Sequence, residues 1–282
     1  MTLPASKRCF RALNPLHTLI YFVPEAEEEY TAAGLRPGRM GYFASRSAAL
    51  GAVGPGPVAA TFFNFKPALV ARHLPRAWTL ATPEQVLAAR LRAVDRALTR
   101  LLGAEALADP AVAEAAELAG AAAAACTFEG RPLAAAHAEL PVPEPAHLAL
   151  WHAATVLREH RGDGHLAALM TAELDGLEAL VTHTATGKGF KAEFARVSRD
   201  WSQEEWDAAV ERLRARGLLD REGALTEAGT ELRRGIERQT ARLAAGPYER
   251  LGEKDLERLA ELTAPLATAV LANGAIPSGP FA

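Results

Sequence analysis

The sequence predicts an almost entirely α-helical protein, and three observations carry this prediction. Apolar residues recur at helical spacing over long segments, most clearly between residues 82 and 103. Residues that favour helix starts, such as Thr, Asp, Ser and Pro, stand before these segments, and glycines often follow them. Runs rich in Gly and Pro, such as residues 54–57, separate one segment from the next.

The first half of the chain divides into helices that can be placed one by one. The predicted helices cover residues 24–34, 38–53, 66–78, 82–103 and 109–128. Thr82 and Asp109 are the predicted N-caps of the last two, and Asn64 that of the third. The apolar segment 58–65 fits either a short strand or a buried helical turn, since periodicity does not separate the two.

Four prolines between residues 132 and 145 mark a change of composition. We place a domain boundary there, with an N-terminal helical region over 1–145 that carries an aromatic cluster. The predicted C-terminal domain, 146–282, contains helices suited to dimer formation at 230–243 and 253–274.

The composition is that of an ordinary globular protein. Of 282 residues, 49% are hydrophobic and 23% charged, which argues against disorder. The net charge of −3 gives no overall attraction to nucleic acid or an anionic membrane. Cys9 and Cys126 match no metal or redox spacing, and no apolar segment is long enough to span a bilayer. We therefore expect a soluble cytoplasmic protein without a membrane partner.

The C-terminal part has a recognisable order of elements. A helix beginning near His165 is followed by a short one over 191–198 and by a helix that starts at Ser202, whose capping box includes Glu205. A short β-wing at 220–224 then leads into a long helix. The pattern is carried by Leu213, Gly217, Leu218, Leu219, Arg221, Leu225, Thr226 and Gly229.

This order and these residues resemble the winged helix-turn-helix of the MarR family. The resemblance implies an all-α fold with a small β-wing, in which the N-terminal helical region packs on a MarR-like winged helix, and it implies a homodimer. The whole chain also looks like a group of actinobacterial helix-turn-helix-like proteins of mostly unassigned function.

DNA binding is the first function that this fold implies, but the charges disfavour it. The N-terminal end of a recognition helix enters the major groove, and here that end carries Glu204, Glu205, Asp207 and Glu211. Carboxylates repel a phosphate backbone, whose attraction for cations supplies most of the affinity. The basic residues that remain as DNA-contact candidates are Lys188, Lys191, Arg196 and Arg199.

Residues 151–169 contain an unusual density of histidines and charges. Gly162-Asp163-Gly164 predicts a break between two helices, with Asp163 as the N-cap of a helix that begins near His165. One interpretation is a ligand-binding or acid–base cluster formed by His152, Glu159, His160, Arg161, Asp163 and His165. The other is a charged corner that only satisfies helix ends. The spacing of the histidines predicts no metal site.

Aromatic residues concentrate in the first 80 positions and form a second candidate site. Tyr42, Phe62 and Phe65, with His17 and His73 nearby, fit the wall of an apolar pocket that has a few polar anchors. The alternative is that these rings only fill a core.

We weigh three functions on this basis. The first is a small-molecule-binding winged-helix protein of the sensor or regulator type, with its ligand between the aromatic and histidine sets and its DNA binding lost. The second is an enzyme whose catalytic candidates are His160, His165, Asp163 and Glu159. The third is a MarR-like DNA-binding regulator. A plainer alternative is a protein-interaction module that uses the acidic face between Trp201 and Trp206. The sequence identifies no cofactor and contains no familiar enzyme motif.

Overall fold

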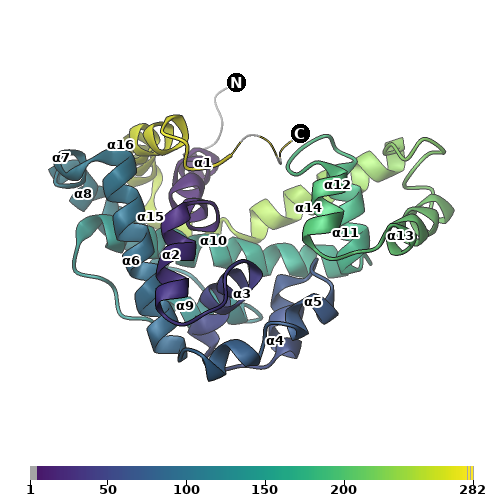
Figure 1. Cartoon of the computed structure of the whole chain (residues 1–282). Coiled ribbons are helices and arrows are strands. Elements are labelled where there is room, and N and C mark those ends of the chain that lie inside the picture. The colour runs from purple at the N-terminus through teal and green to yellow at the C-terminus, as the bar shows by residue number, and fades with distance from the viewer. Residues whose placement is uncertain (1–4, 278, 280, 282) are drawn as a thin grey trace.

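The structure is a computed structural model that describes residues 5–277, 279 and 281, and these residues form helices and connecting turns. Two isolated antiparallel bridges, Phe190–Phe281 and Leu219–Leu225, stand in place of a sheet within this part of the chain. The prediction of an all-helical fold is therefore confirmed (Figure 1). No helix among the described residues is long and apolar enough to cross a lipid bilayer.

The helices of the N-terminal half surround one apolar cluster. They are α1 (Ala5–Thr18), η1 (Leu19–Tyr21), α2 (Pro24–Ala32), α3 (Arg39–Ser47), η2 (Ala48–Leu50), α4 (Pro55–Phe62), α5 (Pro67–Ala71), η3 (Arg76–Thr79), α6 (Pro83–Leu102), α7 (Ala104–Leu107), α8 (Pro110–Ala124) and α9 (Pro132–Ala138). Thr82 forms a capping box with Gln85, and the Asp109 side chain accepts from the Ala111 amide, so both predicted caps are confirmed.

The remaining helices are α10 (Ala146–Thr171), α11 (Gly176–Thr184), α12 (Ala192–Ser198), α13 (Gln203–Ala215), α14 (Glu227–Leu243), α15 (Gly246–Leu251) and α16 (Glu253–Ala272). A second apolar cluster joins the end of α10 to α11, α12, α13 and α14. α15 and α16 return to the first cluster, where Leu256, Leu259 and Val270 are buried. The predicted boundary at 145/146 and the predicted homodimer remain predictions.

The residues that carry the MarR resemblance lie where α13 turns into α14. Thr226 caps α14 by accepting from the Gly229 amide and donates to the Gly217 carbonyl. A Cβ at Gly229 would lie only 2.1 Å from the carbonyl oxygen of Leu218, so this glycine permits a close backbone approach. Residues 219–225 form a tight turn closed by the Leu219–Leu225 bridge.

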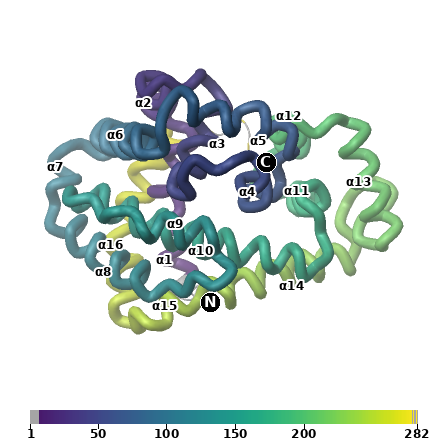
Figure 2. Tube along the Cα trace, turned by 90° about the horizontal axis from the view of Figure 1, so that it is seen from below, coloured from purple at the N-terminus to yellow at the C-terminus, as the bar shows by residue number. Residues whose placement is uncertain are grey.

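The predicted helix break at Gly162-Asp163-Gly164 is wrong. α10, which is 26 residues long, runs through these three residues without a break (Figure 2). It joins the two apolar clusters. The glycines serve close packing instead: a Cβ at Gly164 would lie 2.7 Å from Arg131 Nη1 and 3.3 Å from Leu243 Cβ on α14. The chain breaks later, after Thr171, and Asp175 caps α11 through a capping box with Glu178.

In the aromatic region the structure settles one open alternative and corrects one prediction. Most of the segment 58–65 belongs to α4, which ends at Phe62. The Gly-Pro run at 54–57, which was expected to separate two segments, supplies the prolines of the first turn of this helix. Asn64 does not cap α5. Lys66 occupies the N-cap position, without a side-chain cap bond.

Candidate ligand-binding site

The polar stretch of α10 lies between the two apolar clusters, and Glu159 is its most buried member. Arg46 Nε and Nη2 donate to the two Glu159 carboxylate oxygens at 3.1 and 2.9 Å, and Arg158 Nη1 donates to Oε2 at 2.6 Å. Burial raises the pKa of Glu159, but the charges of Arg158 and Arg46 outweigh this effect and hold the pKa well below its usual value. Glu159 is thus a charged anchor between α3 and α10.

The predicted aromatic set forms a contiguous group of rings beside this anchor. The Tyr42 ring centroid lies 5.9 Å from that of Phe62 and 5.5 Å from that of Phe65. The guanidinium of Arg46 lies over the Phe62 ring at 4.3 Å, within range of a cation–π interaction. Phe43, behind them, is fully buried and belongs to the core.

A cavity of about 310 Å³ opens between these rings and α10, and we call it the aromatic cavity. Its walls also reach α11, α14 and Arg199, which follows α12. Its ring-bearing residues are Tyr42, Phe62, Phe63, Phe65 and Phe190, and its charged or polar residues include Arg46, Asn64, Arg158, Glu159, Asp163, His165, His183, Arg199, Arg233 and Glu237. The cavity therefore brings together six of the predicted residues: Tyr42, Phe62, Phe65, Glu159, Asp163 and His165.

The other predicted histidines lie elsewhere. His17 is buried between Thr155 and Tyr21, each 3.0 Å away. His73 stacks on Phe43 with 5.5 Å between ring centroids. His152 is buried, and burial lowers its pKa. None of these residues lines the aromatic cavity.

His160 and His165, two of the catalytic candidates, do not lie together. Five residues apart on one helix, the two side chains point about 140° from each other. His165 Nδ1 lies 2.8 Å from Thr240 Oγ1 on α14, whereas the buried Nε2 of His160 has no hydrogen-bond partner among the described residues. Burial lowers the pKa of each to about 4, far from the value that suits an acid or base at neutral pH. The described residues contain no group of His, Cys, Asp or Glu that could hold a metal.

Arg161 turns away from the cavity. Its guanidinium lies over the Phe10 ring at 4.7 Å and donates to Glu237 Oε2 at 3.3 Å. It therefore links α10 to α1 and α14.

Asp163 is a helix cap, but for a different helix from the one predicted. Its Oδ2 accepts from the backbone amides of Leu133 and Ala134 at 3.1 and 2.9 Å, at the first turn of α9. Arg131, just before that turn, donates to the carbonyls of His160 and Leu243 and so ties the start of α9 to α10 and α14. Asp163 thus satisfies a helix end through a long-range cap, and it also lines the aromatic cavity.

Asp163→Ala is expected to lower the free energy of unfolding by about 2 kcal/mol, because it leaves two buried amides without an acceptor. Asp163→Asn keeps an acceptor, so it isolates the effect of charge. Burial raises the pKa of Asp163 from 3.8 to about 6. The stability due to its protonation is therefore present below pH 3.8 and lost as the pH rises through about 6. In urea denaturation, the free energy of unfolding of Asp163→Asn should rise relative to that of the wild type as the pH increases from 3.8 to about 6. A difference that stays constant over this interval would contradict the prediction.

The four basic DNA-contact candidates do not share one environment. Lys188 and Lys191 are exposed, whereas Arg196 Nη1 donates to the Trp201 carbonyl. The Arg199 guanidinium lies over the Phe65 and Phe190 rings at 5.1 and 4.7 Å and lines the aromatic cavity.

The acidic start of α13 is engaged by the N-terminal region. Lys66 Nζ donates to Glu205 Oε1 at 2.6 Å, and Trp201 Nε1 donates to the Asn64 carbonyl at 3.0 Å. Glu204 and Asp207 are exposed. Segment 62–66 therefore lines the cavity and also contacts the start of α13.

Sequence reasoning missed several charged or polar residues of the site. Arg46, Arg158, Arg233 and His183 line the cavity, together with Arg199, which the sequence assigned to DNA. The available signal was helical spacing: Arg46 follows Tyr42 by four residues, which places both on one face of α3.

Comparison with known proteins agrees with this architecture. The sequence pattern of a helix-turn-helix family matches residues 6–277, so the chain belongs to this family. No curated protein and no solved structure matches the chain.

Proposed function

We propose that this helix-turn-helix protein is a small-molecule sensor whose ligand binds in the aromatic cavity. One observation carries the proposal: the cavity joins aromatic residues of α3 and α4 to charged residues of α10 and α14 and to Arg199, which follows α12. Its volume of about 310 Å³ is at the lower end of small-molecule sites, which are mostly apolar with a few polar anchors.

The cavity also contains an unused hydrogen-bond donor. The buried Nε of Arg199 has no partner among the described residues, although the guanidinium is held between two rings. An unpaired buried donor costs free energy, and a ligand acceptor would recover it. This favours a ligand with an aromatic or apolar body and at least one acceptor.

A route from the cavity to the helix-turn-helix follows from segment 62–66. A ligand that displaces Phe62 or Phe65 acts on the Lys66–Glu205 and Asn64–Trp201 contacts at the start of α13. In a MarR-like winged helix, α13 is the recognition helix and the turn at 219–225 the shortened wing. We propose that ligand binding changes the position of α13.

DNA binding is the second candidate, because the chain belongs to a helix-turn-helix family. The exposed carboxylates at the start of α13 disfavour tight DNA binding through this helix alone. Such binding would be weak and would fall steeply with salt.

A set of small aromatic and aliphatic compounds tests the cavity by thermal shift. Leu166 lines the cavity, so Leu166→Trp should fill it, whereas Ala167→Trp adds the same ring at an exposed neighbour on α10. Compounds should raise the melting temperature of the wild type and Ala167→Trp equally, and that of Leu166→Trp much less. At a ligand concentration 100 times Kd, the stabilisation is about 2.7 kcal/mol. Equal shifts in all three proteins, or shifts in none, would refute the proposal.

A further inference from the structure

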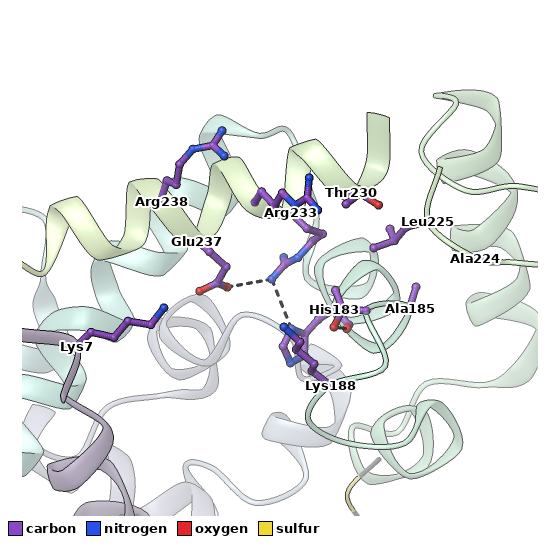
Figure 3. Close-up of a pocket in the computed structure, with 12 residues that line it drawn as sticks. Lys7, His183, Ala185, Lys188, Ala224, Leu225, Thr230, Arg233, Glu237 and Arg238 are labelled. Atoms are coloured by element: carbon purple, nitrogen blue, oxygen red, sulfur yellow. Dashed lines mark hydrogen bonds and ion pairs between the residues drawn. The ribbon is translucent and has the colours of Figure 1, made fainter. Parts of the chain in front are cut away.

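A second and larger opening adjoins the aromatic cavity at α14. It is a groove of about 840 Å³ between α14, the end of α11 and the segment after it, with Lys7 of α1 at its edge (Figure 3). We call it the cationic groove. Arg233, His183 and Glu237 form the wall that it shares with the aromatic cavity.

Positive charge dominates the cationic groove. Its lining includes the cations Lys7, Lys188, Arg233, Arg234 and Arg238 against one carboxylate, Glu237. Arg238 is paired with Glu231, at 2.6 Å. No ion pair within the described part of the chain engages Lys7, Lys188 or Arg234. The Glu237 carboxylate is shared between two arginines, because it also accepts a hydrogen bond from Arg161 at 3.3 Å.

Arg233 is the most informative of these residues, because it is only 5% exposed. Its Nη2 lies 3.3 Å from Glu237 Oε1 and 3.5 Å from His183 Nδ1 (Figure 3). Its buried Nε and Nη1 have no partner among the described residues. A buried guanidinium with two unused donors and one long ion pair is costly, and an oxyanion would satisfy it.

The side chains in contact with this arginine are one carboxylate, Glu237, and the ring of His183. Burial lowers the pKa of His183, and the charge of Arg233 lowers it further, so the imidazole is neutral and adds no positive charge. The loop passes directly over this ring at Gly189, where a Cβ would lie 2.7 Å from His183 Nε2.

We propose that the cationic groove binds a small molecule that carries a phosphate group, with Arg233 at the phosphate and Lys188 and Arg234 as outer cations. Several unpaired cations favour a multiply charged anion over a monocarboxylate, which would neutralise only one of them. The burial of Arg233 favours a small molecule over a DNA backbone, whose phosphates stay at the protein surface. The inference does not depend on a ligand in the aromatic cavity.

Calorimetric titration with inorganic pyrophosphate, at constant ionic strength, tests the inference. We expect binding by pyrophosphate and none by acetate. Arg234→Gln and Lys188→Gln should each weaken binding roughly tenfold, as expected for loss of one charge-assisted contact. Arg242→Gln is the matched control, since it removes one exposed charge from the same helix outside the groove.

Arg233→Gln should abolish pyrophosphate binding, and circular dichroism should show whether it remains folded. Should it unfold, the two surface variants still decide the question. Equal Kd values for Arg234→Gln, Lys188→Gln and Arg242→Gln would overturn the assignment. The assignment would also be overturned if pyrophosphate did not bind and duplex DNA did, with the DNA binding weakened by Arg234→Gln. The groove would then be assigned to DNA.

Discussion

Replacement of Glu159 by alanine is expected to lower the free energy of unfolding by about 3–5 kcal/mol. The substitution leaves Arg46 buried without its bidentate partner, and it removes the contact of Arg158 as well. An uncompensated buried charge is among the largest effects that one substitution produces. Urea denaturation at neutral pH measures the loss.

Two controls separate burial from simple ion pairing. Glu28 forms a 2.7 Å pair with Arg96 at the surface, with both side chains about half exposed, so Glu28→Ala should change stability little. Because the folded-state pKa of Glu159 is depressed, its contribution is present above the usual carboxyl pKa of about 4.3 and disappears as the pH falls through the folded value. The deficit of Glu159→Ala should shrink in acid, and a deficit independent of pH would contradict this account.

Gly176→Ala is the second substitution with a large expected effect. A Cβ at this position would lie 2.0 Å from the carbonyl oxygen of Phe63 and 3.3 Å from Asn64 Cα. Both are backbone atoms, so α11 and the segment that lines the aromatic cavity must move apart. We expect a loss of about 3 kcal/mol in the free energy of unfolding, the upper range for overpacking.

The matched control for this prediction is Gly120→Ala in α8. A Cβ at Gly120 meets no heavy atom within 4 Å, so the same added methyl group should stabilise the helix by about 0.5–1 kcal/mol. Thermal denaturation of the two variants should give shifts of opposite sign. A small shift for Gly176→Ala would mean that the contact between α11 and residues 63–64 is not tight.

Local signals predicted the helical elements well, because caps and periodicity depend on neighbouring residues. Thr82, Asp109 and Ser202 cap the helices that they were expected to cap. The failure at Gly162-Asp163-Gly164 has a tertiary cause. The residues that explain Gly164 are Arg131 and Leu243, which are distant in sequence.

The candidate site shows the same division. The sequence predicted that aromatic and charged residues gather at one place, and Tyr42, Phe65 and Glu159 do line one cavity. It did not predict the partners across the cavity, because Arg46 and Glu159 are 113 residues apart. Histidine density was misleading, since His17 and His160 lie outside the cavity.

The return of α15 and α16 to the first apolar cluster has a consequence for protein engineering. The segment from α11 to α13 follows α10 and leads into α14, and α10 and α14 pack side by side (Figure 2). It therefore has the topology of an insertion, whose two ends are held together by Arg131 contacts to His160 and Leu243. Insertions with adjacent ends can be exchanged as units. A related segment could be transplanted between these two helices while the parent scaffold stays in place.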